Sequence, residues 1–533
     1  MKVRLLHTDD DLPRGGGGEL SEHQRDLVDD LGLDLLLDAM AAGDEHVRRV
    51  CSAWLLAGLE DVEEVGRRQG VVADALAHPE VVAAMYAAIG SGLETARRSS
   101  AGLYRESPEP VVRRSVERLR VHLDILRRLR GQARRVRGSV RSGPWRELVE
   151  ELVTVVAEDA DAEMEALLEE LTFPRGMLLS ARIGRGATGV DHVLRRPRSQ
   201  GWLSRSVDRS GDSFELPDRD DEAVTALAAW RERALAPVAT QLSAAADDVE
   251  AFLRRLRDEL AFLLGAIQLG DRLAGAGLET CFPEVVAGPA ASRSSDGAGA
   301  GAAAGDGVGA GDGREATAPR WRASGLYDPA LALRIGAEVV PGDLDADGAG
   351  LVVVTGANQG GKSTLLRAIG SAQVLAQAGL FVPAAQLRLE LRSRVHVHFG
   401  REEDRRLRRG RLEEELERMR RITERLQPGD LLLANESFAS TNEAEGSAVA
   451  HGVFTALADA GIRVVAVTHL YELARRLQAD DRDDTLFLRA RREEDGTRPY
   501  RIEPGSPEPT SYGRDLYLDI FGEEPDGGST DGA

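Results

Sequence analysis

The sequence contains very little lysine and very little asparagine. Only two lysines and three asparagines occur among its 533 residues. All three asparagines and one lysine fall in two short stretches, Thr355–Thr364 and Ala434–Gly446. Because nearly every other basic side chain is arginine, a retained lysine indicates a position that needs a compact ammonium rather than a forked guanidinium. Lys362 is therefore the first candidate for a chemical role.

Cysteine and long apolar runs are also scarce. The two cysteines, Cys51 and Cys281, are too few for a disulfide framework, and their spacing does not suggest a metal site. No run of 18 or more uncharged apolar residues occurs, and Met1–His7 leads directly into acidic residues. We therefore expect a cytoplasmic protein with no membrane partner. Its length and its 42% apolar composition predict three or four packed domains.

The first of the two stretches has the pattern of a phosphate-binding loop. It follows the apolar run Leu351–Val354 and precedes the helix-like segment Leu365–Ile369, which is the strand, loop and helix order that this motif needs. Backbone N–H groups and the helix N-terminus would bind phosphate oxygens. The alternative is a glycine-rich turn between two core elements. The residues predicted to bind nucleotide are Gly356, Gly360, Gly361, Lys362, Ser363 and Thr364.

Two further apolar runs end in polar residues. Leu431–Ala434 precedes Asn435 and Glu436, and Ile462–Val467 precedes Thr468 and His469. Ligands of open α/β sheets bind at the carboxyl ends of strands, so both pairs are candidates for one site. Glu436 is predicted to orient or deprotonate an attacking water, and His469 to sense a γ-phosphate. The alternatives are a surface carboxylate and a core histidine.

Four groups of residues occur in the order and spacing of one known family. They are Thr355–Thr364, then Asn435–Glu436 with Ser440, Thr441 and Gly446, then Thr468–Leu473, and last Pro504–Gly505 with Ser511–Gly513. Over roughly residues 320–525 the sequence resembles the ATPase domain of the MutS family of DNA mismatch repair proteins. Upstream, Leu59–Gln69 resembles the Arg-Gln helix of the family's helical core.

This resemblance implies an ABC-type ATPase that uses ATP and Mg²⁺ and forms a homodimer in which the partner subunit completes each nucleotide site. Lys362, Glu436 and His469 are then the predicted catalytic residues, and Ser363 and Asn435 the predicted metal ligands. The resemblance also implies that Asn358 positions phosphate or partner groups. Tyr327 is a candidate for stacking on the adenine, with a core tyrosine as the alternative.

The chain departs from the family pattern at two positions near the nucleotide. Asn435 stands where the family ordinarily has aspartate, which predicts weaker metal binding and slower hydrolysis. The family's Gly-Arg-Ser-Thr signature is represented by Gly410 and Arg411 without the serine, and the alternative to a contact with the partner's nucleotide is a solvated charged helix. The residues predicted to act across subunits or as a switch are Gly410, Arg411, Ser440, Thr441 and Asn442.

The third departure concerns DNA recognition. Mismatch readers of the family insert a phenylalanine of a Phe-x-Glu motif into the duplex. The matches here, Phe282–Glu284 and Phe521–Glu523, lie far from the position of such a reader. We therefore expect no N-terminal mismatch-reading domain, and mismatch recognition does not follow from the resemblance.

The formal net charge of −21 conceals a strongly basic segment. Between Arg97 and Arg146 there are 15 arginines and four acidic residues. Apolar residues recur there at helical spacing, which places the arginines largely off the apolar face. A second basic stretch is Arg182–Arg209. Both are candidates to follow a phosphate backbone, with solvated surface arginine as the alternative. The predicted DNA-contacting residues are Arg113, Arg114, Arg118, Arg127 and Arg128.

The predicted fold is an all-α core and lever region followed by an α/β P-loop ATPase domain. Residues 1–286 form the helical core, lever and clamp region, in which Phe173–Leu194 has room for one or two strands and the apolar seam from Val249 to Ile267 fits either a long lever or a bundle helix. Residues 287–318 are a disordered Gly/Ala-rich linker, 319–525 the ATPase domain and 526–533 a flexible tail.

The function predicted from these patterns is that of an ATP-dependent protein that binds duplex or branched DNA, in mismatch repair or related DNA processing. ATP binding would close a dimeric clamp, and hydrolysis would reset it. The alternative is a nucleotide-gated scaffold that binds a protein partner through its acidic helical surface without contacting DNA.

Overall fold

The structure is a computed structural model of the chain that describes residues 4–7, 20–100, 107–155, 158–174, 176–185, 189–195, 221–288, 320–337, 339–356, 360–400, 410–491 and 499–507. The chain divides into two compact units. Unit 1 comprises Met1–Leu5 and Ala77–Ala261, and unit 2 comprises Leu6–Leu76 and Phe262–Ala533. The division falls inside one long helix, α9 (Asp221–Gly275).

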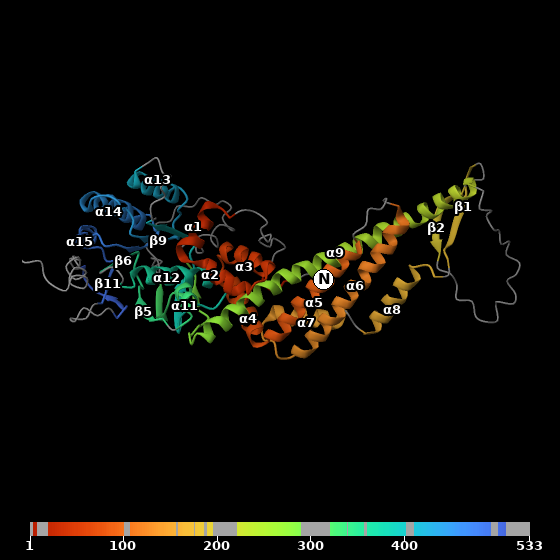
Figure 1. Ribbon diagram of the computed structural model, residues 1–533, viewed down its shortest axis with the longest axis horizontal. Coiled ribbons are helices and arrows are strands. Elements are labelled where there is room, and N and C mark those ends of the chain that lie inside the picture. The colour runs from red at the N-terminus through yellow and green to blue at the C-terminus, as the bar shows by residue number, and fades with distance from the viewer. Residues whose placement is uncertain are drawn as a thin grey trace, which may run out of the picture. The chain divides into compact units, whose positions relative to one another are not determined.

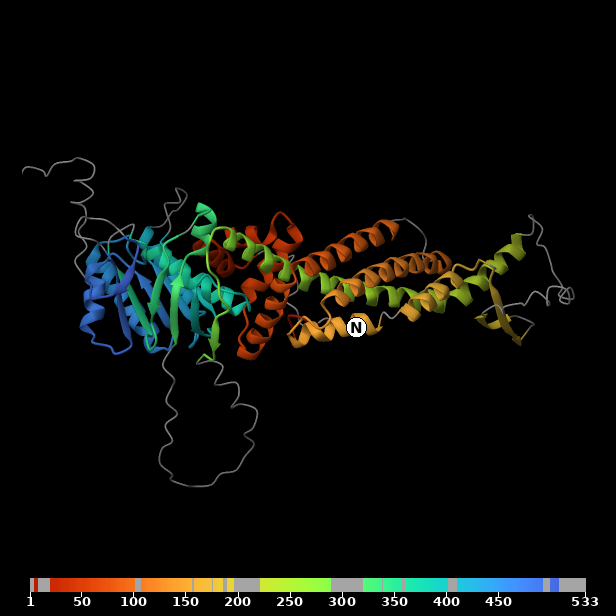
Figure 2. The ribbon, with the colours of Figure 1, turned by 90° about the horizontal axis from the view of Figure 1, so that it is seen from below.

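Unit 1 is mainly helical. It contains α5 (Pro79–Ser100), α6 (Pro108–Val136), α7 (Gly143–Val155), α8 (Glu158–Glu170) and the first part of α9. The stretch between α8 and α9 holds the antiparallel hairpin of β1 (Leu178–Ile183) and β2 (Gly189–Arg195), so the predicted strands are confirmed. Figures 1 and 2 show α5, α6 and α9 running side by side in this unit.

The apolar stripe of α6 forms part of the core of unit 1. Val112 and Val116 are buried and pack with Leu235 and Ala239 of α9 and with Leu168 of α8. The periodicity expected from the sequence is therefore confirmed, because a helix with one apolar stripe buries that stripe against its neighbours.

Unit 2 begins with four short helices. They are α1 (Glu22–Leu31), α2 (Leu33–Ala41), α3 (Glu45–Ala57) and α4 (Val62–Ala77). The unit continues with the end of α9, β3 (Glu284–Val286), β4 (Trp321–Leu326), α11 (Pro329–Ile335), β5 (Gly342–Asp345), β6 (Leu351–Thr355), α12 (Lys362–Gln377), β7 (Gln386–Glu390) and β8 (Val395–Phe399). Last come α13 (Arg411–Thr423), β9 (Leu431–Asn435), α14 (Glu443–Asp459), β10 (Arg463–Val467), α15 (Tyr471–Ala479), β11 (Thr485–Ala490) and β12 (Ile502–Pro504).

The strands of unit 2 form two sheets. The larger has the order β12-β11-β6-β10-β9-β8 and is parallel except for β12, whereas the smaller has the order β3-β7-β4-β5. Every residue of β6 and β10 is buried, as expected of central parallel strands covered on both faces. Leu432 and Ala434 of β9 pack in the core beneath α13, α14 and α15, while Leu433 points to α12 on the other face.

The compact units differ from the predicted division at residue 286. Arg367 of α12 donates a hydrogen bond to the Asp30 carbonyl of α1 (3.1 Å), and buried Arg68 of α4 donates to the Ala378 carbonyl at the end of α12 (3.2 Å). Strand β3 pairs with β7 of the smaller sheet. Helices α1 to α4 therefore belong with the two sheets of unit 2, because long-range packing rather than sequence order sets the unit.

Other predicted boundaries lie outside the part of the chain that the structure describes. These are the linker apart from residues 287 and 288, the end of the ATPase domain after residue 507, and the C-terminal tail. Among the described helices, none is by itself both long and apolar enough to cross a membrane, although the consecutive pair α4 and α5 meets that test by length and composition.

Candidate functional site

Three neighbouring strands of the larger sheet end at the same level. In the parallel register, Val467 of β10 lies between Val354 of β6 and Asn435 of β9. Each chain segment therefore leaves the sheet at the same edge. Lys362, Glu436 and His469 lie together there, as the sequence predicted.

The phosphate-binding loop connects β6 to α12. Helix α12 starts at Lys362 behind an N-cap, Gly361, with φ 87°. Gly356 has φ 119°, and a β-carbon there would lie 2.9 Å from the β-carbon of Ala490. Glycine is therefore required at both turns, by backbone conformation at Gly361 and also by space at Gly356. The loop residue Asn358 lies outside the described residues.

Lys362 is held inside this loop. Its side chain is buried, and Nζ donates a hydrogen bond to the Gly356 carbonyl at 2.7 Å. Burial lowers the pKa of Lys362, and the negative charge of Glu436 opposes that shift. Lys362 therefore lies close enough to Glu436 to interact with its charge. It also lies at the N-terminus of α12, where backbone N–H groups favour the binding of anions.

Ser363, in the first turn of α12, contacts Asn435 at the end of β9. The Ser363 hydroxyl donates a hydrogen bond to Oδ1 of Asn435 at 2.9 Å. Two adjacent oxygens of an octahedral Mg²⁺ shell are about 3 Å apart when the metal–oxygen distances are about 2.0–2.1 Å. The pair therefore fits one edge of a Mg²⁺ shell by both distance and ligand type, although both oxygens are neutral.

Glu436 and His469 form the polar pair beside Lys362. The backbone N–H of His469 donates to Oε2 of Glu436 at 3.1 Å, and Nδ1 of the ring contacts the same oxygen. This hydrogen bond raises the pKa of His469, while partial burial opposes the rise. Glu436 has φ 54°, a left-handed conformation that a non-glycine residue adopts only when its surroundings hold it.

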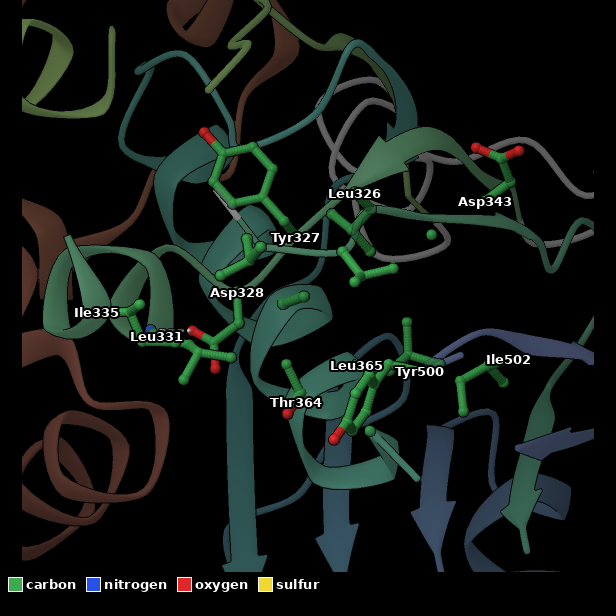
Figure 3. Close-up of a pocket in the computed structure, with 15 residues that line it drawn as sticks. Leu326, Tyr327, Asp328, Leu331, Ile335, Asp343, Thr364, Leu365, Tyr500 and Ile502 are labelled. Atoms are coloured by element: carbon green, nitrogen blue, oxygen red, sulfur yellow. Dashed lines mark hydrogen bonds between the residues drawn. The ribbon is translucent and has the colours of Figure 1, made fainter. Parts of the chain in front are cut away.

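A cavity of about 390 Å³ adjoins the start of α12. Its lining includes Gly361 and Thr364 and two aromatic residues, Tyr327 and Tyr500. In Figure 3 the Tyr500 ring lies beside Thr364, whereas the Tyr327 hydroxyl points away from both. Tyr327 is 4% exposed and Tyr500 is 55% exposed. Tyr500 thus presents an accessible ring at the cavity, and the sequence analysis did not identify it. The signal that could have found it is the scarcity of aromatic residues, since the chain has only seven tyrosines.

Comparison with known proteins agrees with this geometry. The family model of the MutS2 N-terminal domain matches residues 60–276, and that of MutS domain V matches residues 352–516. The chain belongs to the MutS family. The domain V match contains Ser363, Asn435, Glu436 and His469, and that domain is a P-loop ATPase domain.

Curated relatives of this MutS-family chain bear related names. "Endonuclease MutS2" of Carboxydothermus hydrogenoformans is 33% identical over 164 residues, which are 30% of this chain and 21% of that protein. "Endonuclease MutS2" of Lactiplantibacillus plantarum is 31% identical, over 32% of this chain and 21% of that protein. "DNA mismatch repair protein MutS 2" of Haloarcula marismortui is 30% identical, over 50% of this chain and 29% of that protein. The chain thus spans less than a third of each relative.

The predicted switch residues of the MutS-family chain lie around Glu436. Gly410 is the N-cap of α13, and Arg411 is the first residue of that helix. Arg411 and Ser440 line a hollow of about 210 Å³ together with Glu436. Thr441 donates to a carboxylate oxygen of Glu445 at 2.6 Å, and Asn442 caps α14. Their roles across a subunit interface stay predictions.

The predicted DNA-contacting arginines lie on α6, inside the MutS2 N-terminal domain match. Arg118 pairs with Asp247 and Glu250 of α9, and its side chain is largely buried. Arg127 pairs with Asp161 and Glu165 of α8, and Arg128 with Asp124 one turn away. Among the described residues, no ion pair involves Arg113 or Arg114.

Proposed function

We propose that this protein binds and hydrolyses ATP at the strand ends of unit 2 and binds DNA in an ATP-dependent manner. One observation carries the ATPase part. The carboxyl edge of three adjacent parallel strands brings together buried Lys362 and four further polar residues, Ser363, Asn435, Glu436 and His469. This is where open α/β sheets bind ligands, and the site offers a cation, two hard oxygens and a carboxylate.

Each residue has a role in this proposal. The loop amides and Lys362 bind the phosphates and stabilise negative charge on the oxygens of the transferred group. Glu436 orients the attacking water and accepts its proton, while His469 fixes the carboxylate through the contact at Oε2. Ser363 and Asn435 would hold Mg²⁺, which, when bound, neutralises phosphate charge. Neutral Asn435 supports slow turnover.

The nucleoside part of ATP fits the apolar cavity beside α12. Its lining of Leu326, Leu331, Tyr500 and Ile502 suits a flat, weakly polar base, and its volume of about 390 Å³ lies within the range of small-molecule sites. We assign base stacking to Tyr500, whose accessible ring borders the helix that follows the phosphate loop. Tyr327 then lines the cavity as a buried residue, which is consistent with the alternative of a core tyrosine.

The proposal that the protein binds DNA rests on the names of its relatives and on the positive charge of α6. Relatives are named for mismatch repair or as endonucleases, and α6 contributes arginines that lie off its apolar face. Closure of two ATPase heads into a homodimeric clamp on duplex or branched DNA is the proposed use of ATP. Arg113 and Arg114 are the α6 residues best suited to phosphate contact.

The experiment compares phosphate release by wild-type protein, Glu436→Gln and Lys362→Ala. Wild type should release phosphate only with Mg²⁺. Glu436→Gln should bind ATP but release phosphate about 10²–10⁴-fold more slowly, as expected for loss of a general base. Equal release by wild type and Glu436→Gln would remove Glu436 from the chemistry.

The ion pairs of α6 also favour a second candidate function. Because Arg118 and Arg127 are already paired with acidic residues of α8 and α9, unit 1 is suited to a scaffold that binds protein rather than DNA. The salt dependence of binding separates the two functions, since phosphate contacts make log K fall steeply with log salt. If the protein does not bind duplex DNA even at low salt, the scaffold function is favoured.

A further inference from the structure

The segment that carries Glu436 is a tight, strained turn. Glu436 has φ 54° and Phe438 has φ 61°, so two non-glycine residues separated only by Ser437 adopt left-handed conformations. Such conformations persist when neighbouring groups hold them. The turn leads from β9 toward α14, and it sets the position of the Glu436 carboxylate relative to His469.

One side of the turn is closed by α14. A β-carbon at Gly446 would lie 2.3 Å from the Phe438 carbonyl oxygen, so the helix backbone packs directly against the turn. Glycine at this position permits that approach. The opposite side of the turn must be held by other groups.

His398 of β8 contacts that opposite side. Its ring is 1% exposed, and Nδ1 lies 2.6 Å from the Ser437 hydroxyl oxygen. Nε2 lies 3.2 Å from the Glu415 carbonyl oxygen of α13, and the ring packs against Phe438 with centroids 5.6 Å apart. A single buried histidine therefore joins β8, the turn and α13.

The hydrogen-bond roles of this ring follow from its partners. The Glu415 carbonyl can only accept, so Nε2 carries the proton and donates to it. Burial lowers the pKa of His398 to about 4, so the ring is neutral at neutral pH and Nδ1 is an acceptor. The Ser437 hydroxyl therefore donates to Nδ1 across the shorter of its two contacts, the other being to the His398 carbonyl at 3.2 Å.

We propose that His398 is a positioning residue for ATP hydrolysis, which holds the Glu436 turn through Ser437 so that the carboxylate faces the attacking water. This inference rests on the proposed ATPase function. The ring of His398 contacts Ser437, Glu415 and Phe438 rather than Lys362 or the proposed metal ligands, so its loss affects the chemical step rather than nucleotide binding. The contact to Glu415 places α13 but does not itself set the carboxylate.

Three substitutions separate the two contacts of the ring. His398→Leu removes both while keeping similar bulk, His398→Asn keeps a polar atom at the Nδ1 position, and His398→Gln keeps a donor at the Nε2 position. His398→Leu should lower kcat about 10–100-fold, as for a small misplacement of a catalytic group, with the Kd for ATP changed by less than about threefold. His398→Asn should restore kcat and His398→Gln should not.

Several outcomes would overturn this assignment. They are wild-type kcat in His398→Leu, a loss of ATP affinity that parallels the loss of kcat, or rescue by Gln instead of Asn. Ser437→Ala serves if His398→Leu does not fold, and it should show the same loss of kcat, with no further loss when combined with His398→Asn. His451→Leu on α14, where His451 pairs with Asp480, is the control and should leave kcat unchanged.

A second measurement is independent of turnover. Hydrogen exchange of backbone amides in residues 436–442 should be faster in His398→Leu than in wild type and should return to the wild-type rate in His398→Asn. If wild-type protein releases no phosphate, the ATPase proposal fails, and this exchange measurement still decides whether His398 holds the turn. Unchanged exchange in His398→Leu would show that it does not.

Discussion

The hydroxyl of Ser363, in the first turn of α12, donates a hydrogen bond to Oδ1 of Asn435, the last residue of β9. This contact joins the start of α12 to the strand that ends directly before Glu436. It places a neutral amide where the resemblance to the MutS family leads one to expect a carboxylate. The first prediction follows from that difference in charge.

Asn435→Asp should strengthen Mg²⁺ binding and speed hydrolysis. A carboxylate attracts the cation more strongly than an amide does at the same distance. The Mg²⁺ concentration for half-maximal phosphate release should fall on the order of tenfold, which corresponds to about 1.4 kcal/mol. Asn435→Ala should shift it in the opposite direction. A Mg²⁺ titration that is the same for all three proteins would exclude Asn435 as a metal ligand.

Arg113→Ala/Arg114→Ala should weaken binding to duplex DNA uniformly across sequences. Each lost phosphate contact should reduce the slope of log K against log salt by about 0.9, so the double variant should lose up to about 2. Fluorescence anisotropy at several salt concentrations measures the slope. An unchanged slope would remove both residues from the interface.

Arg118→Ala should act differently from the Arg113/Arg114 pair. Its guanidinium is largely buried and contacts Glu250 at 2.6 Å, so truncation removes the more buried of the two arginines that the structure pairs with this largely buried carboxylate and leaves it with Arg254. We expect a loss of about 1–3 kcal/mol in the free energy of unfolding and little change in the salt slope. Thermal unfolding followed by circular dichroism checks the first part. A normal Tm with a reduced slope would instead support direct DNA contact.

Tyr500→Ala should lower ATP affinity, and Tyr500→Phe should not. Stacking of a base on an aromatic ring contributes about 1–3 kcal/mol, which corresponds to a roughly 5–150-fold change in Kd. Titration with a fluorescent ATP analogue measures this. Tyr327→Phe is the matched comparison, because that ring is buried and its hydroxyl points away from Thr364. Loss of affinity in Tyr327→Phe but not in Tyr500→Ala would reverse the assignment.

Acid should destabilise unit 2 through His23. This ring packs against His396 with centroids 4.6 Å apart and the ring planes tilted by 40°, and burial, followed by the charge of His396, lowers the pKa of His23 to about 4. In the unfolded chain the pKa of His23 is about 6.5, so between pH 4 and pH 6.5 the unfolded state binds more protons than the folded state. The stabilisation is present above about pH 6.5 and is lost as pH falls toward 4. His23→Gln should show a smaller fall in Tm between pH 7 and pH 5, and an equal fall would contradict this.

Local patterns predicted the nucleotide site well. Buried parallel strands appear in a sequence as continuous apolar runs, and here the polar residues of the site follow these runs directly. The positions of Lys362, Asn435 and His469 could therefore be predicted. Strand bounds differed by one residue, since β9 includes Asn435 and β10 begins at Arg463. The convergence of these groups is confirmed, whereas their catalytic roles stay predictions.

Contacts between residues far apart in the sequence could not be predicted in the same way. The packing of α1 and α4 on α12 depends on contacts such as Arg68 with the Ala378 carbonyl, 310 residues apart, which no local period encodes. The same holds for the ion pairs of Arg118, whose partners lie about 130 residues further along the chain. His398 escaped notice because a histidine in a buried strand reads as core until the Ser437 hydroxyl is placed beside it.

Calorimetric titration of Mg²⁺-ATP into wild-type protein and into Lys362→Ala tests the central claim most directly. The claim is that the strand ends around Lys362 bind a nucleoside triphosphate. We expect a single binding event per chain in wild type and a loss of at least about a hundredfold in affinity in Lys362→Ala, since a partly buried charge-assisted contact to phosphate is removed. Equal affinity of the two proteins, or no binding to wild type, would contradict the account.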